Sequence, residues 1–245
     1  MAPRPGGSYT PAAAMPISIT VVVPVYNEAD FIPEALPQLI AAVDAAEVPF
    51  TIRLVENGST DGTGEVAKAT TNDPRVVIDS LPDADYGAAM RHGFLAAEGD
   101  WVVNFDIDYF SGDFLRQLVE QPPEIDLVIG SKRDPRSEDR RPLIRRIATR
   151  VFNLMLRVLL DSTVSDTHGM KGFRRSLVED ITPRVVSTKD LFDTELVVRA
   201  ERAGYRIVEV PVIVAEMRAA RSSLVKRAPR TIAGLLKIRR LLRRV

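Results

Sequence analysis

Two aspartates one residue apart follow a strand-like segment in the middle of the chain. Residues 101–105, Trp-Val-Val-Asn-Phe, favour a buried strand, and Asp106 and Asp108 come directly after it. The carboxyl ends of strands are where open α/β sheets build their ligand sites. Two carboxylates at this spacing can converge on a hard divalent cation, which can in turn hold a diphosphate. The alternative is a solvated acidic turn.

The first half of the chain alternates strand and helix patterns, which predicts the frame that positions this pair. We expect strands over residues 17–23, 51–55, 75–79, 101–105 and 127–129. We expect helices over residues 30–46, 61–71, 85–98 and 112–120. This alternation predicts an α/β fold with a mostly parallel central sheet and helices on both faces.

The second half is less regular. Its segments are a polar loop at 131–141, an apolar helix at 142–160, a loop at 166–171, an amphipathic helix at 189–203, an extended segment at 205–214 and a basic helix at 224–244. The first sixteen residues are rich in Pro, Gly and Ala, and we expect a disordered tail there. The domain boundaries that we predict are 1–16 for the tail, 17–223 for one domain and 224–245 for a C-terminal helix.

Composition excludes several classes of protein. The net charge is zero, so the chain as a whole does not resemble a nucleic-acid-binding protein. It has no cysteine, which excludes disulfides and thiolate metal sites and is compatible with the cytoplasm. No apolar run approaches the ~20 residues that span a bilayer. Residues 217–245 contain basic but no acidic residues, which suggests an anionic partner for that end.

Four segments around these strands resemble the GT-A glycosyltransferases of family 2. They are Val-Pro-Val-Tyr-Asn-Glu at 23–28, Val-Glu-Asn-Gly-Ser-Thr-Asp-Gly-Thr at 55–63, the glycine-spaced segment 87–93 and Ala-Glu-Gly-Asp at 97–100. Asp106 and Asp108 follow as that family's Asp-x-Asp pair. The resemblance implies the GT-A fold, with a nucleotide-sugar-binding half over 17–130 and an irregular acceptor half over 131–223.

Within the family, the second half is similar to the polyprenyl-phosphate (dolichyl-phosphate) mannose and glucose synthases. The matching segments are 130–132, 166–171, 192–196, 204–207 and 209–212. The resemblance implies a metal-dependent, inverting hexosyltransferase. Its donor would be a UDP- or GDP-linked sugar, its cofactor Mg²⁺ or Mn²⁺, and its acceptor a polyprenyl phosphate.

The same resemblance assigns roles to residues at the strand ends. The segment that shapes the nucleotide pocket would comprise Pro24, Tyr26, Asn27 and Glu28. Glu56 and Asn57 would bind the base or ribose, whereas the alternative for both is a plain turn. Asp106 would contact the donor, and Asp106 and Asp108 would bind the metal. We expect Asp61 to be the N-cap of the following helix.

This sequence departs from the family in two places. Phe110 stands where the lipid-phosphate branch has a metal-binding Gln, and the 166–171 segment is one residue short. His168 falls in that segment, and we expect it to serve as the missing metal ligand; the alternative is a loop histidine with a local hydrogen bond. For His92 we expect a surface or core position.

Basic residues carry the argument for an anionic acceptor. Those that would hold the acceptor phosphate and donor diphosphate are Lys132, Arg133, Arg146 and Arg218, with Arg145 beside them. A hydroxyl acceptor would instead need a general base, for which Asp166 and Asp193 are the candidates. Asp193 and Glu195 are spaced so that both could face the cleft. The alternative is that Asp193 caps a helix at 194–203.

Three other functions remain as alternatives. A glycosyltransferase with a soluble hydroxyl acceptor would need the base just described. A nucleotidyltransferase would need a Gly-rich basic loop after the first strand, which residues 24–28 do not supply. A nucleotide-sugar-binding protein with degraded catalysis is favoured by Phe110 and opposed by the intact acid pair.

The C-terminal helix suggests a membrane surface. Its apolar residues that can share one face are Ile232, Leu235, Leu236, Ile238 and Leu242. Its basic residues lie largely elsewhere, so residues 224–245 are typical of a peripheral helix on the inner face of the cell membrane. The alternative is that the apolar face packs on the domain or on a second copy of the chain in a homodimer.

Overall fold

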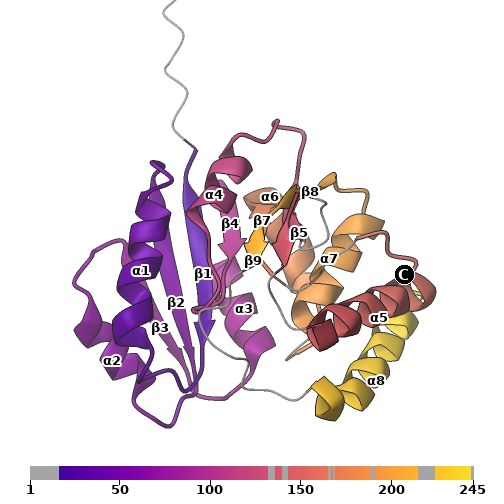
Figure 1. Ribbon diagram of the computed structural model, residues 1–245, viewed down its shortest axis with the longest axis horizontal. Coiled ribbons are helices and arrows are strands. Elements are labelled where there is room, and N and C mark those ends of the chain that lie inside the picture. Colours follow the sequence, from indigo (N-terminus) through magenta and orange to yellow (C-terminus); the bar gives the residue numbers. More distant parts are fainter. Residues whose placement is uncertain are drawn as a thin grey trace, which may run out of the picture.

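A seven-stranded sheet with the order β3-β2-β1-β4-β7-β5-β8 forms the centre of the described part of the chain (Figure 1). The computed structural model describes residues 17–131, 136–139, 143–164, 167, 169–188, 191–214 and 224–243. The strands of this sheet are β1 Ile19–Val25, β2 Phe50–Asn57, β3 Val76–Leu81, β4 Trp101–Asn104, β5 Leu127–Ser131, β7 Lys171–Arg174 and β8 Ile207–Pro211.

The other elements surround or extend this sheet. The helices are α1 Ile32–Asp44, α2 Thr63–Thr70, α3 Tyr86–Leu95, α4 Gly112–Val119, α5 Leu143–Leu160, α6 Arg175–Ile181, α7 Phe192–Arg202 and α8 Leu224–Leu242, with a 3-10 turn η1 at Thr182–Arg184. Two short strands, β6 Glu138–Asp139 and β9 Ile213–Val214, pair with each other. The prediction of a loop over residues 131–141 is therefore wrong for residues 138–139, which form β6.

The sheet is mostly parallel, as predicted, with one exception. β1 pairs in parallel with β2 and with β4, so the carboxyl ends of these three strands meet at one edge. β7 runs antiparallel between β4 and β5. Residues 166–171 were predicted as a loop, and no strand was predicted after it. In the structure Lys171 begins β7 and lies opposite Asn104.

Alternate residues of the strands pack on opposite faces of the sheet. Val21 and Val23 of β1 join a core cluster with residues of α1, α2 and α4. Val22, between them, joins a second cluster with residues of α3, α6 and α7. This is the period-2 alternation of a strand that is buried on both faces. Helices on both faces were predicted, and the structure confirms them.

A third, smaller cluster joins α5, α7 and α8. Leu156 and Leu160 of α5 pack with Leu235 and Ile238 of α8, all of them almost fully buried. Figure 1 shows α5 and α8 side by side near the β5–β8 end of the sheet. Much of the apolar face predicted for the C-terminal helix therefore packs on the domain, which was the alternative to a membrane contact. No helix within the described ranges is long and apolar enough to cross a membrane.

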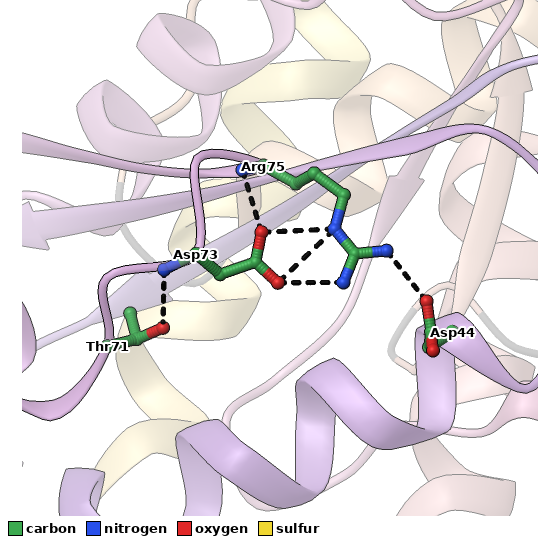
Figure 2. A network of polar contacts seen from close by, with 4 residues as sticks. All are labelled: Asp44, Thr71, Asp73 and Arg75. Atoms are coloured by element: carbon green, nitrogen blue, oxygen red, sulfur yellow. Dashed lines mark hydrogen bonds and ion pairs between the residues drawn. The ribbon is translucent and has the colours of Figure 1, made fainter.

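A polar network ties together elements at the opposite edge of the sheet, where β3 begins. The Arg75 guanidinium binds the Asp73 carboxylate and reaches Asp44 at the end of α1, with 2.7 Å between Nη1 and Oδ1 of Asp44 (Figure 2). Its carbon centre lies 4.2 Å from the centroid of the Phe50 ring. Hydrogen bonds from Arg75 lower the pKa of Asp73. This edge is structural and lies away from the strand ends that carry the acid pair.

Candidate active site

The loops that follow β1 and β2 are joined by hydrogen bonds. The backbone N–H of Asn27 donates to Ser59 Oγ at 3.0 Å, and Thr60 N–H donates to Asn27 Oδ1 at 2.8 Å. Asn27 has a left-handed backbone, with φ 53°, which an asparagine tolerates better than most residues. The Glu28 N–H donates to Thr63 Oγ1 at 2.8 Å. The predicted nucleotide segment thus has a fixed shape.

Glu56 and Asn57 end β2 and are buried. The Glu56 carboxylate accepts a hydrogen bond from the backbone N–H of Ser59, so it closes its own turn. Asn57 Oδ1 accepts from the N–H of Asp85 at 2.8 Å, which ties this turn to the start of α3. Gly58 has φ +65°, and a side chain there would collide with the backbone before α3. These contacts fit the plain-turn alternative, and the nucleotide-binding roles of Glu56 and Asn57 stay predictions.

Asp61 was predicted to be the N-cap of α2, and this prediction is wrong. The N-cap position is Gly62, whose φ of 84° is left-handed. Asp61 lies one residue earlier, where its carboxylate accepts from the N–H groups of Thr63 and Ala29, each at 3.0 Å. Desolvation raises the pKa of Asp61, but the hydrogen bonds from the Thr63 hydroxyl and from these two N–H groups outweigh it, so the pKa is lowered on balance. Its role is structural, as a bridge between the two loops.

Asp106 and Asp108 lie on a closed turn directly after β4. The Tyr109 N–H donates to Asp106 O at 3.0 Å, and the Asp106 N–H donates back to Tyr109 O at 3.3 Å. Ile107 and Tyr109 are buried in the first core cluster, whereas Asp106 is exposed and Asp108 half-buried. The core therefore anchors alternate residues of the turn and leaves both acids near the surface at the carboxyl end of β4.

Phe110 packs half-buried against the same core and offers no ligand atom. Within the described residues, no group of three or more His, Asp or Glu side chains is placed to hold a metal ion. His168, which we expected to complete the site, lies outside the described residues, so its ligand role stays a prediction. His92 is not at this edge: its side chain is 41% exposed, with Nε2 3.5 Å from Asp79 Oδ2.

A buried polar cluster lies beside the acid pair and connects the two halves of the chain. The Tyr86 hydroxyl, on α3, donates to Asp193 Oδ2 on α7 at 2.8 Å. The Lys171 ammonium is fully buried, 3.6 Å from the same oxygen, and donates to Gly169 O at 2.5 Å. Because Lys171 lies opposite Asn104 in the sheet, the cluster is close to the carboxyl end of β4.

The pKa of Tyr86 responds to two nearby acids, Asp193 and Asp106. Desolvation and the negative charges of Asp193 and Asp106 raise the pKa of Tyr86 well above its usual range, and a hydrogen bond with Asn104 opposes them. Tyr86 is therefore a neutral hydrogen-bond donor at physiological pH. Asp193 Oδ1 is buried and has no hydrogen-bond partner among the described residues.

The capping alternative for Asp193 is wrong. α7 begins at Phe192 with Leu191 at the N-cap, so Asp193 lies inside the first turn. Glu195 is bound to other partners. Its carboxylate accepts hydrogen bonds from the N–H of Ser187 at 2.7 Å and from Arg199. The expectation that both acids face one cleft is therefore wrong for Glu195.

The remaining predicted residues divide into placed and unplaced. Pro24 is half-buried at the end of β1, Tyr26 is 45% exposed beyond it, and Arg146 is exposed on α5. Four more lie outside the described residues: Lys132, Arg133, Asp166 and Arg218. The side chain of Arg145 is also outside the described part.

Tyr86 and Lys171 belong to this polar cluster, and the sequence predicted neither of them there. Lys171 ends the segment 166–171 and was given no role there. Lysine is rarely fully buried, so its burial in the structure is unusual. Tyr86 begins the helix that carries the glycine-spaced segment, and nothing in the local pattern indicates that its hydroxyl reaches α7. The pairing of β4 with β7 places Lys171 there, and the contact between α3 and α7 brings Tyr86 to Asp193.

Comparison with known structures identifies the fold. Glucosyl-3-phosphoglycerate synthase of Mycobacterium tuberculosis, solved with Mn²⁺, UDP and phosphoglyceric acid, superposes with a TM-score of 0.68 at 22% identity, covering 91% of this chain and 78% of that one. Mannosyl-3-phosphoglycerate synthase of Rubrobacter xylanophilus superposes with a TM-score of 0.65 at 21% identity, covering 93% and 75%. The fold is GT-A, as the sequence resemblance implied.

Sequence comparison finds closer relatives. The glycosyltransferase AglD of Haloferax volcanii is 32% identical over 82% of this chain, which spans only 34% of that protein. An uncharacterised glycosyltransferase of Mycobacterium tuberculosis is 34% identical over 80% of this chain and 84% of its own length. The undecaprenyl-phosphate 4-deoxy-4-formamido-L-arabinose transferase of Yersinia enterocolitica is 30% identical over 66% of this chain and 50% of its own length. Residues 20–182 match the family described as glycosyl transferase family 2, and the chain belongs to that family.

Proposed function

We propose that this protein transfers a sugar from a nucleotide diphosphate sugar to a lipid phosphate, with Asp106 and Asp108 holding a divalent cation. The observation that carries the proposal is the anchored turn 106–109. It presents two carboxylates where β4 ends, next to the nucleotide segment of β1. Open α/β sheets bind their ligands at such an edge.

The donor set fits a hard cation. Carboxylate oxygens are the ligands that Mg²⁺ and Mn²⁺ prefer, and Mg²⁺ is often held by one or two carboxylates together with substrate phosphates. A third protein ligand is therefore not required, although His168 is our candidate for one. When bound, the cation would offset the charge of the leaving diphosphate. Structural neighbours crystallised with Mn²⁺ or Mg²⁺ and UDP support this choice.

The donor would occupy the edge formed by the β1 and β2 loops. Asn27 and Glu28 are held by the β2 loop, so they can offer a fixed surface to the base and ribose. Pro24 and Tyr26 flank them, and Tyr26 is exposed enough to stack on a base. Glu56 and Asn57 would support this surface by holding the turn after β2 in place.

The transfer we propose is a direct displacement. An oxygen of the acceptor phosphate forms a bond to the anomeric carbon as the bond from that carbon to the donor diphosphate breaks. The electron pair leaves with the nucleoside diphosphate, and the anomeric configuration inverts. No proton has to be removed, because a phosphate acceptor is already ionised. Basic side chains for the phosphates would be Lys132, Arg133, Arg146 and Arg218.

Relatives support a lipid phosphate as acceptor. The protein of Yersinia enterocolitica is named for undecaprenyl phosphate and matches 66% of this chain. An acceptor that lies in a membrane would bring the protein to that membrane's surface, and we propose that it works on the cytoplasmic face.

A hydroxyl acceptor is the second candidate, and one observation favours it. Asp193 Oδ1 is buried without a hydrogen-bond partner among the described residues, while Oδ2 is held by Tyr86 and lies near Lys171. A carboxylate oriented in this way could take a proton from a hydroxyl. Asp166 is the other candidate base.

One experiment separates these functions. Release of nucleoside diphosphate is measured over a panel of UDP- and GDP-sugars, with Mg²⁺, Mn²⁺ or a chelator, and with polyprenyl phosphate or soluble hydroxyl acceptors. We expect release to need both a metal and polyprenyl phosphate. Asp193→Asn should then slow transfer less than ~10-fold, whereas loss of a general base would slow it by ~10²–10⁴-fold. Metal-independent release, or no release with any donor, would contradict the proposal.

A further inference from the structure

One side of α5 carries a row of apolar side chains that the described part of the chain leaves uncovered. These side chains are between 48% and 66% exposed and belong to Leu143, Ile147, Val151, Leu154 and Val158. At about 100° per residue they fall within an arc of about 80° and extend for roughly 22 Å along the helix. We call this row the α5 stripe.

The stripe faces outward because the opposite side of α5 is already packed. Leu156 and Leu160 are buried against Leu235 and Ile238 of α8 in the cluster that also contains Val198 of α7. The helix therefore cannot turn to bury the stripe without giving up this core. A continuous exposed apolar row of this length marks an interaction surface.

The charges beside the stripe indicate which partner it fits. Arg146, Arg150 and Arg157 are exposed and occupy the adjoining arc of the helix. Residues 143–160 include no acidic residue, and neither does α8. In α8, Lys237 and Arg240 are exposed as well. An apolar row flanked by arginines suits a surface that is apolar beneath and negatively charged above.

We propose that the α5 stripe docks on the surface of an anionic lipid membrane. Its apolar side chains would enter the boundary between headgroups and acyl chains. Arg150 and Arg157 would extend along the helix to the lipid phosphates. The membrane contact predicted for the C-terminal helix is thereby moved to α5, with α8 as its support. The contact needs no sugar donor, so it stands apart from the transfer chemistry proposed above.

A second copy of the chain fits the stripe less well. Two identical stripes that pair about a twofold axis would bring the arginines of both helices to the same contact. α5 offers no carboxylate to balance them, and like charges brought together in this way oppose association. A dimer through α5 is therefore an outcome that the experiment has to recognise.

The test is flotation of the full chain with vesicles of phosphatidylglycerol and phosphatidylcholine, and with vesicles of phosphatidylcholine alone. The stripe variant is Val151→Ser/Leu154→Ser. Its matched control is Ile232→Ser/Leu236→Ser, which removes two apolar side chains that are 43% and 39% exposed on α8. We expect the stripe variant to bind anionic vesicles at least ~10-fold more weakly, because two apolar side chains no longer leave water. The control should bind like the wild type.

The charge is tested separately with Arg150→Gln/Arg157→Gln. Loss of two basic residues near an anionic surface should weaken vesicle binding by roughly 10- to 30-fold. Neutral vesicles should bind the wild type poorly. The chain has no cysteine, so Leu154→Cys gives a single position for an environment-sensitive dye. Its emission should shift to the blue on anionic vesicles.

Three results would overturn the proposal. The wild type could fail to float with anionic vesicles, the stripe variant could float as well as the wild type, or the wild type could be a dimer that only the stripe variant dissociates. Circular dichroism and donor nucleotide binding, which all variants should keep, show that the fold is intact. A failure of the proposed transfer would appear in the nucleotide assays and not in flotation.

Discussion

At the scale of single residues, Tyr86 connects the acid pair to the acceptor half. Its hydroxyl holds Asp193 Oδ2, and its pKa is raised by burial and by Asp193 and Asp106. A tyrosine in this position stays protonated over the whole range in which the enzyme would work. Its hydroxyl fixes one carboxylate oxygen of Asp193, so we propose Tyr86 as a positioning residue for that carboxylate.

Tyr86→Phe should lower the free energy of unfolding by about 1.5–3 kcal/mol, because a partly buried hydrogen bond to a charged group is lost. The folded pKa of Tyr86 is raised, so this contribution is fully present below about pH 10, the unfolded value, and is lost as the pH rises through the folded pKa. Urea denaturation at pH 7 and at strongly alkaline pH measures both effects.

Tyr205→Phe is the matched control for that variant. The Tyr205 hydroxyl bonds Asp180 at 3.0 Å, away from the acid pair, and burial together with Asp180 raises the pKa of Tyr205 too. Both variants should lose stability, but only Tyr86→Phe should slow sugar transfer. Equal transfer rates in the two variants would leave Tyr86 with a purely structural role.

The sequence was informative about residues whose roles are local. Asp106 and Asp108 follow a strand, and the strand alone predicts the edge at which they lie. Asp193 was recognised as a candidate, but its surroundings were not, because Tyr86 and Lys171 reach it from helices and strands far away in the chain. Long-range contacts of this kind leave no periodic signal in the sequence.

At the scale of elements, α3 is held against the sheet by a close approach at Gly93. A Cβ there would lie 2.3 Å from Val22 Cγ1 and 3.1 Å from Val55 Cγ2. Both valines are buried and β-branched, so they cannot move aside. The glycine-spaced segment 87–93 thus lets α3 approach β1 and β2 closely enough to bring Tyr86 to the site.

Gly93→Ala should lower the free energy of unfolding. The overpacking costs ~1–3 kcal/mol, of which alanine's better helix propensity recovers up to about 1 kcal/mol. Gly64→Ala is the control, since a Cβ there meets only ordinary contacts, with Glu56 Cγ at 3.5 Å. Thermal denaturation of the two variants tests this. If Gly93→Ala were as stable as Gly64→Ala, the packing argument for the segment would be refuted.

The elements that the sequence predicted well are those with strong periodicity. β1, α1, β2 and the helices of the first half lie within a few residues of their predicted bounds. β7 was missed because Lys171-Gly172-Phe173-Arg174 is short and has no apolar alternation that would separate it from a loop. It is a strand because β4 and β5 pair with it on both sides.

At the scale of the whole molecule, α5 and α8 form an addition to the sheet that depends on a small core. Leu235 is fully buried in that core, whereas its neighbour Leu236 is 39% exposed. Leu235→Ala should lower the free energy of unfolding by about 2–5 kcal/mol, and Leu236→Ala should change it little. Chemical denaturation compares the two. Equal effects would mean that α8 does not pack as described.

In the function that we propose, Asp106 and Asp108 bind the donor through a divalent cation. Calorimetric titration of UDP and GDP in the presence and absence of Mn²⁺ tests it most directly. The proteins to compare are the wild type, Asp106→Asn, Asp108→Asn and, as a control, Asp113→Asn, which removes an exposed acid paired with Arg116.

We predict that Mn²⁺ strengthens nucleotide binding by the wild type and by Asp113→Asn. Asp106→Asn and Asp108→Asn should each reduce that strengthening by at least ~10-fold, because even substitutions of residues that only support metal ligands have an effect of this size. Nucleotide binding without metal should stay unchanged. If Asp106→Asn and Asp108→Asn kept the full effect of Mn²⁺, or if the wild type bound neither nucleotide more tightly with the metal, the central claim would be contradicted.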